Sequence, residues 1–131
     1  MTDLGANALT GIVTKESPRS VPDTVTRLVD LVAAKGLKLF ALIDHSGEAN
    51  AVGLDLRETK VVIFGSPEAG TPVMVDAPLA ALDLPLKVLV WESADGKTLL
   101  SYNSPEFLQQ RHGLDAPPFE PVVGLLQLAS R

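Results

Sequence analysis

Residues 86–103 read LKVLVWESADGKTLLSYN, in which two apolar segments of strand length flank the turn sequence SADG. This turn suits a type I turn followed by Gly96 in the left-handed region, as in three-residue hairpin loops. Residues that face each other across an antiparallel hairpin keep a constant sum of residue numbers, which pairs Val88 with Tyr102. The stretch therefore predicts an antiparallel hairpin and, with it, a mainly antiparallel sheet.

An amphipathic helix is predicted upstream, over residues 23–35. Its start is marked by Ser20 and Asp23, whose spacing suits a capping box, and its end by Gly36. One helix face carries apolar residues at helical spacing, namely Val25, Leu28, Val29 and Val32. We expect this face to pack on the sheet.

The remaining segments complete an α+β pattern. The apolar run at residues 37–44 predicts a strand that is buried on both faces. Further strands are expected at residues 9–15 and 60–64. Short helices are expected at residues 46–52, 67–75 and 105–112. No repeat or linker divides the chain, so we expect residues 1–131 to form a single compact α+β domain with helices packed on a mainly antiparallel sheet.

The composition is that of an ordinary globular protein, with 131 residues, 46% hydrophobic content and a net charge of -5. The 11 basic residues are outnumbered by 16 acidic ones, which argues against nucleic acid as a partner. No stretch approaches the roughly 18 to 20 apolar residues that span a bilayer, and no leader pattern is found. Cysteine is absent, which excludes disulfides and thiolate metal sites. We expect a cytoplasmic protein without nucleic-acid or membrane partners.

The sequence contains no recognised motif for a nucleotide, a metal or a catalytic nucleophile, so no cofactor and no metal are expected. Polar residues that interrupt or end apolar strands remain as candidates. Asp44 and His45 follow one strand, although Asp44 or Ser46 can simply cap the next helix. Lys87 lies inside an apolar strand, where it either snorkels to solvent or is enclosed and serves as a base or an anion anchor. Glu92 is explained equally well as a residue at the rim of the sheet.

These candidates predict one composite site. We expect the end of the 37–44 strand, the turn at residues 65–71 and the strand that carries Lys87 to approach one another. The site would comprise Asp44, His45, Thr71, Lys87 and Glu92. His45 and Lys87 would be its chemically active members, and the two carboxylates would orient them or tune their pKa values. Such a lysine favours a small anionic ligand.

Several short motifs follow one another along the chain: Asp44-His45, Ala51, Gly53-Leu54, Phe64-Gly65-Ser66-Pro67, Gly70-Thr71, Met74, Leu82-Asp83-Leu84-Pro85-Leu86-Lys87, Trp91-Glu92, Tyr102-Asn103 and Arg111-His112-Gly113. Together they resemble the bacterial family known as domain of unknown function 302, over most of the length of the chain. The family usually has Asn where this chain has Ser66. The resemblance implies a compact α+β domain and is compatible with dimerisation, but it implies no activity. Arg111 and His112 are also explained as cations at a helix end.

Three functions remain open. The preferred one is a binding module for a small molecule or anion. The second is an enzyme whose base is His45 or Lys87, oriented by Asp44 or Glu92. The third is a homomeric interaction domain without a ligand. We also expect a symmetric homodimer, because the C-terminal segment is uniformly apolar at Val122, Val123, Leu125, Leu126 and Leu128. Docking of this segment within one chain is the alternative.

Overall fold

The computed structural model describes residues 11–119 and 121–131. The strands form one antiparallel sheet in the order β1-β5-β4-β3-β2. They are β1 (Ile12–Ser17), β2 (Lys38–Asp44), β3 (Thr59–Gly65), β4 (Leu86–Glu92) and β5 (Thr98–Asn103). The helices are α1 (Val21–Ala34), α2 (His45–Ala51), α3 (Pro67–Asp76), α4 (Pro105–His112) and α5 (Val122–Ala129), with a 3-10 helix, η2 (Pro78–Leu82). The predicted α+β fold is confirmed. Residues 9 and 10, expected in the first strand, lie outside the described residues.

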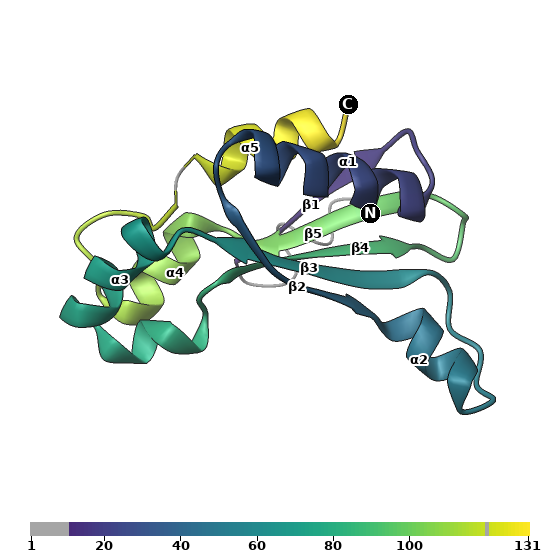
Figure 1. Ribbon diagram of the computed structural model, residues 1–131, viewed down its shortest axis with the longest axis horizontal. Helices are drawn as coiled ribbons and strands as arrows, with labels where there is room; N and C mark the ends of the chain where they lie inside the picture. Colours follow the sequence, from purple (N-terminus) through teal and green to yellow (C-terminus); the bar gives the residue numbers. More distant parts are fainter. Residues whose placement is uncertain (1–10, 120) are drawn as a thin grey trace.

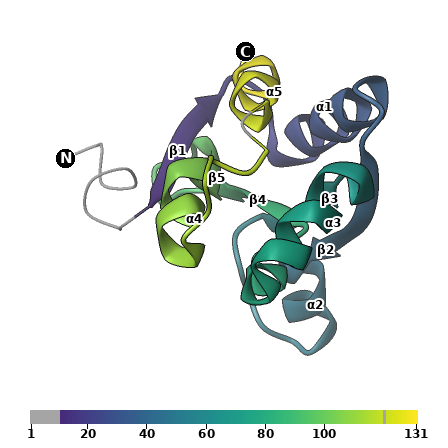
Figure 2. The same ribbon diagram turned by 90° about the vertical axis from the view of Figure 1, so that its left-hand side faces the viewer.

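Helix α1 packs on the sheet through the predicted stripe. The Ser20 hydroxyl accepts a hydrogen bond from the backbone N–H of Asp23 at 3.2 Å, and Gly36 follows the helix with a φ of 72°. Leu28 and Val32 are almost completely buried. Figure 1 shows α1 and α5 on one face of the sheet, and Figure 2, viewed from the end that carries α3 and α4, shows both helices on the same side.

The predicted hairpin is confirmed in its register. Val88 lies opposite Tyr102 in the β4–β5 ladder. The turn is closed by a 2.9 Å hydrogen bond from the backbone N–H of Ser93 to the carbonyl of Lys97, and Gly96 has a φ of 83°. Glycine adopts this left-handed conformation without the steric cost that a side chain would add.

The C-terminal segment docks within the chain. Helix α5 contacts α1 and contributes buried residues to the core: Val122, Leu125, Leu126 and Ala129. The Arg27 guanidinium also donates a hydrogen bond to the carbonyl of Leu128 at 3.1 Å. The alternative of docking within one chain is therefore confirmed, and the apolar face of this segment no longer gives a reason to expect a dimer, because it completes the core. The homodimer itself stays a prediction.

Strand β2 lies at an edge of the sheet, and the expectation that it is buried on both faces is wrong. Leu39, Phe40, Leu42 and Ile43 are 37–49% exposed. An apolar run is typical of a buried strand. It does not show whether both faces of the strand are covered or whether the strand lies at the edge of the sheet. The opposite edge of the sheet is formed by β1.

Candidate functional site

The predicted site residues are spread over the two ends of the sheet. Asp44 and His45 lie where β2 ends, whereas Thr71 lies in α3, which follows β3. Because β2 and β3 are antiparallel, the end of β3 at Gly65 is opposite Lys38, at the start of β2. A strand of seven residues spans roughly 20 Å. His45 and Thr71 are therefore separated by the length of the sheet.

The two faces of the sheet separate the predicted residues further. Asp44 is opposite Lys60, and Lys60 is opposite Val90, which is fully buried beneath the helices. Glu92 is two residues from Val90 and so shares this face, whereas Lys87 is three residues away and points to the other face. The expected cleft shared by all the predicted residues is therefore not formed. Ligand binding by any one of them stays a prediction.

Asp44 caps helix α2, as the simpler interpretation of this residue predicted. Its carboxylate accepts a 2.9 Å hydrogen bond from the backbone N–H of Gly47 and pairs with the Lys60 ammonium at 2.9 Å. The Gly47 bond, followed by the bonds from Lys60 and Ser46, lowers the pKa of Asp44 to about 2. His45 is exposed beside this cap.

A cluster of charged residues lies at the opposite end of the sheet. Nε2 of His112 is 2.6 Å from a carboxylate oxygen of Asp83, and the Arg111 guanidinium is 3.1 Å from the same oxygen. The side chains of His112 and Asp83 are only 7% and 15% exposed, whereas Arg111 is 50% exposed. Burial makes the Asp83–His112 pair the more rigid half of this cluster.

Local sequence explains how α4 presents these side chains. The Ser104 hydroxyl caps the helix by accepting a 3.0 Å hydrogen bond from the backbone N–H of Phe107. Gly113 ends the helix in the left-handed conformation, with a φ of 63°. Arg111 and His112 thus lie in the last helical turn, where cations also complement the helix dipole. Asp83 follows η2 and meets them from a separate segment.

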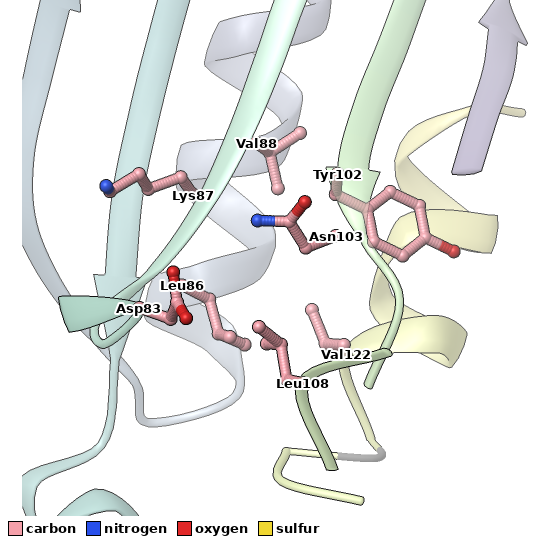
Figure 3. Close-up of a pocket in the computed structure, with 8 residues that line it drawn as sticks. All are labelled: Asp83, Leu86, Lys87, Val88, Tyr102, Asn103, Leu108 and Val122. Carbon is pink, nitrogen blue, oxygen red and sulfur yellow. The ribbon is translucent and has the colours of Figure 1, made fainter. Parts of the chain in front are cut away.

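A small cavity of about 20 Å³ adjoins Asp83 (Figure 3). It is lined by Asp83, Leu86, Lys87, Val88, Tyr102, Asn103, Leu108 and Val122. The figure shows the Asn103 amide and the Asp83 carboxylate facing the space between them, whereas the Lys87 ammonium extends away from Asn103. A volume of this size holds about one water molecule.

The hydrogen-bonding character of the cluster follows from its partners. Because a carboxylate only accepts hydrogen bonds, Nε2 of His112 is the donor to Asp83, which leaves Nδ1 for another partner. Burial, together with the charge of Glu106, raises the pKa of Tyr102, so its phenol stays protonated at neutral pH. His112 also borders a larger cavity of about 700 Å³, between α3 and residues 112–119.

Of the five predicted residues, Lys87 alone lines the small cavity beside Asp83. Thr71 lies instead against an apolar cavity of about 300 Å³ that includes Phe40 and Met74. The residues that sequence reasoning did not include in the site are all part of the family motifs: Asp83, Asn103, Arg111 and His112. The helix dipole accounts for cations at the end of α4, but it does not account for their convergence with Asp83.

No group of three or more His, Asp or Glu side chains within residues 11–119 and 121–131 is placed to hold a metal ion. None of the helices described is both long and apolar enough to cross a membrane.

The chain is similar to curated proteins that are longer than itself, and it matches only part of their length. Fluoride-specific ion channel FluC 1 of Brucella suis biovar 1 is 41% identical over 104 residues, which make up 79% of this chain and 41% of that protein. Fluoride-specific ion channel FluC 1 of Brucella abortus biovar 1 is also 41% identical, over 38% of its length. The chain thus spans about two fifths of these relatives.

The fold has a counterpart among solved structures. The crystal structure of an uncharacterized conserved DUF302 protein from Bacillus stearothermophilus superimposes with a TM-score of 0.71, over 92% of this chain and 88% of that chain, at 18% sequence identity. The family model described as Domain of unknown function DUF302 matches residues 13–122. Because this match covers most of the chain, the protein belongs to the DUF302 family.

Proposed function

We propose that this chain is a binding module for a small anion, held beside Asp83 by Lys87, Asn103 and Arg111. The observation that carries the proposal is a cation beside the cavity that no described carboxylate neutralises by direct pairing. Arg111 already offsets the carboxylate of Asp83, and Lys87 adds a cation that has no ion-pair partner among the described residues. Glu106 also acts on Tyr102 at this cavity, so cations and carboxylates are balanced there, and the Lys87 ammonium, unpaired in the part of the chain that the structure describes, is the group that favours an anionic ligand.

Each of the three residues contributes hydrogen-bond donors. The Asn103 amide faces the cavity and supplies N–H groups. Lys87 is exposed, so its ammonium has room to turn toward an anion at the mouth of the cavity. Arg111 is half exposed and keeps guanidinium N–H groups that do not contact Asp83. Hydrogen bonds from charged donors to an anion are roughly twice as strong as neutral ones.

Fluoride is the first anion to test. A fluoride ion is close in size to a water molecule, and the cavity of about 20 Å³ has room for one such particle. The relatives that share 41% identity with this chain are named fluoride-specific ion channels. The contacts of Arg111 and His112 with Asp83 reduce the repulsion between its carboxylate and a bound anion.

Fluorine NMR of sodium fluoride titrated with the protein tests the proposal, with sodium chloride and inorganic phosphate as competitors. We expect saturable broadening or shift of the fluoride signal. The Lys87→Met variant should keep the aliphatic contacts but lose the charge. It should bind fluoride at least about tenfold more weakly than the wild type. Lys97→Met is the matched control, because Lys97 lies in the exposed turn between β4 and β5.

Two results would overturn the proposal. One is a protein that binds none of fluoride, chloride and phosphate at millimolar concentration. The other is an equal loss of anion affinity in Lys87→Met and Lys97→Met, which would show that binding depends on the net charge of the protein and not on the cavity. Saturable binding of phosphate in place of fluoride would retain the anion site and change its ligand.

The Asp83–His112 pair favours a second candidate, an enzyme that uses acid–base chemistry. An imidazole oriented by a partly buried carboxylate at 2.6 Å and bordering a 700 Å³ cavity has the arrangement of a general base. Turnover of p-nitrophenyl acetate or p-nitrophenyl phosphate that falls about 10²-fold in Asp83→Asn would support this function. Turnover that is unchanged in Asp83→Asn would argue against it.

A further inference from the structure

Exposed apolar side chains are concentrated in one part of the described chain. Of ten large apolar side chains that are strongly exposed, seven lie between residues 39 and 56: Leu39, Phe40, Leu42, Ile43, Val52, Leu54 and Leu56. The first four belong to strand β2. A concentration of exposed apolar side chains of this kind is typical of a protein interface.

The two edges of the sheet differ in how they are protected. Strand β1 carries Lys15 and Glu16, and charged side chains are a usual device against pairing with another chain. Strand β2 has no charge between Lys38 and Asp44, and its outer row of backbone N–H and C=O groups has no neighbouring strand among the described residues. The β2 edge is therefore open to β-sheet extension.

We propose that a second copy of this chain pairs with β2, antiparallel and about a two-fold axis, to join the two sheets into one. Charge complementarity identifies the partner as a second copy. Strand β2 has a cation at one end, Lys38, and an anion at the other, Asp44. Asp44 shares the Lys60 ammonium with Glu58, so these three side chains keep a net negative charge. Antiparallel pairing centred on Ala41 brings Lys38 close to the partner's Asp44, and the symmetry repeats this contact.

The register of this pairing follows from the same centre. Ala41 lies on the axis and faces the partner's Ala41, where a small side chain lets the strands approach. The β-bulge falls between Leu39 and Ala41, so the segment from Ala41 to Asp44 keeps regular strand geometry. The apolar side chains of β2 would then cover those of the second copy on both faces of the extended sheet.

Light scattering of the purified protein tests the dimer. We expect a dimer mass at tens of micromolar concentration and a monomer mass for Leu42→Asp, which places charges in the interface. Leu42 is 49% exposed in one chain, so the variant should fold, as circular dichroism can verify. Leu79→Asp is the matched control, because Leu79 is 73% exposed but belongs to η2 and not to β2, and this variant should remain a dimer.

A single-cysteine variant tests the register without disturbing the fold. The chain has no cysteine, so Ala41→Cys introduces the only thiol. Facing residues of antiparallel strands have Cα atoms roughly 4.5 to 5.5 Å apart, within the range of a disulfide. Mild oxidation should link Ala41→Cys into a dimer and leave Ala33→Cys, on the exposed side of α1, unlinked.

Three outcomes would overturn the proposal. The first is a monomer mass for the unmodified chain. The second is a dimer that persists in Leu42→Asp, which would locate the contact on another surface. The third is failure of Ala41→Cys to cross-link faster than Ala33→Cys, which would exclude antiparallel pairing centred on residue 41. None of these outcomes depends on whether the chain binds an anion.

Discussion

The carboxyl group of Asp44 has several partners that favour its charged form. The backbone N–H of Gly47, the Lys60 ammonium and the Ser46 hydroxyl all donate to it and lower its pKa from 3.8 to about 2. Burial alone would lower the pKa of Lys60, but its bonds to Asp44 and Glu58 raise it. The cap of α2 and the ion pair at the end of β2 therefore depend on a single deprotonated side chain.

The lowered pKa predicts acid sensitivity. Folded Asp44 binds its proton near pH 2 and unfolded Asp44 near pH 3.8, so its contribution to stability is present above pH 3.8 and is lost as the pH falls through about 2. We expect the melting temperature of the wild-type chain to fall more steeply over this window than that of Asp44→Asn. Asp55→Asn, an exposed control, should behave like the wild type. Equal slopes for all three proteins would contradict the prediction.

The candidate site was only partly predictable from single residues. Lys87 was identified because an ammonium inside an apolar strand is costly unless it has a role or a route to solvent. Asp83 and His112 are separated by 29 residues in sequence, and no spacing rule connects them. For Asp44, the local sequence correctly predicts a helix cap. The shared cleft was predicted wrongly, because strand pairing decides which residues lie on the same face and at the same end of the sheet.

At the scale of elements, local signals were reliable and non-local ones were not. Helix α1 and the β4–β5 hairpin are defined by caps, turn residues and periodicity within a few residues, and both were predicted. The burial of β2 and of α5 depends on which elements of the fold lie beside them. Both are apolar segments, yet one is an exposed edge and the other is core.

Helix α5 provides a paired prediction about stability. Leu126 is fully buried, so Leu126→Ala should lower the free energy of unfolding by about 2 to 5 kcal/mol, through lost burial and a new cavity. Gly124 lies in the same helix with open space around the position of an added Cβ. Gly124→Ala should raise the free energy of unfolding by about 1 kcal/mol. Urea unfolding followed by circular dichroism measures both changes. A negligible loss in Leu126→Ala would show that α5 is not docked in solution.

At the scale of the whole molecule, the sheet separates the anion site from the β2 edge. The small cavity lies over β4 and β5, whereas β2 is two strands away from β4. Neighbouring strands are about 4.8 Å apart, so the two regions are separated by roughly 10 Å or more. The side chains that line the cavity belong to neither β2 nor α2.

This separation predicts that anion binding and dimerisation are independent. Effects of substitutions more than about 7 to 10 Å apart usually add within about 0.5 kcal/mol, which is about a twofold change in Kd. Monomeric Leu42→Asp should therefore bind fluoride within about twofold of the wild-type Kd, and Lys87→Met should keep the dimer mass. The fluorine NMR titration and light scattering, applied to both variants and to the double variant, measure this. Loss of fluoride binding in Leu42→Asp, with the fold intact, would mean that the second copy is needed to order the cavity, and the module would then act only as a dimer.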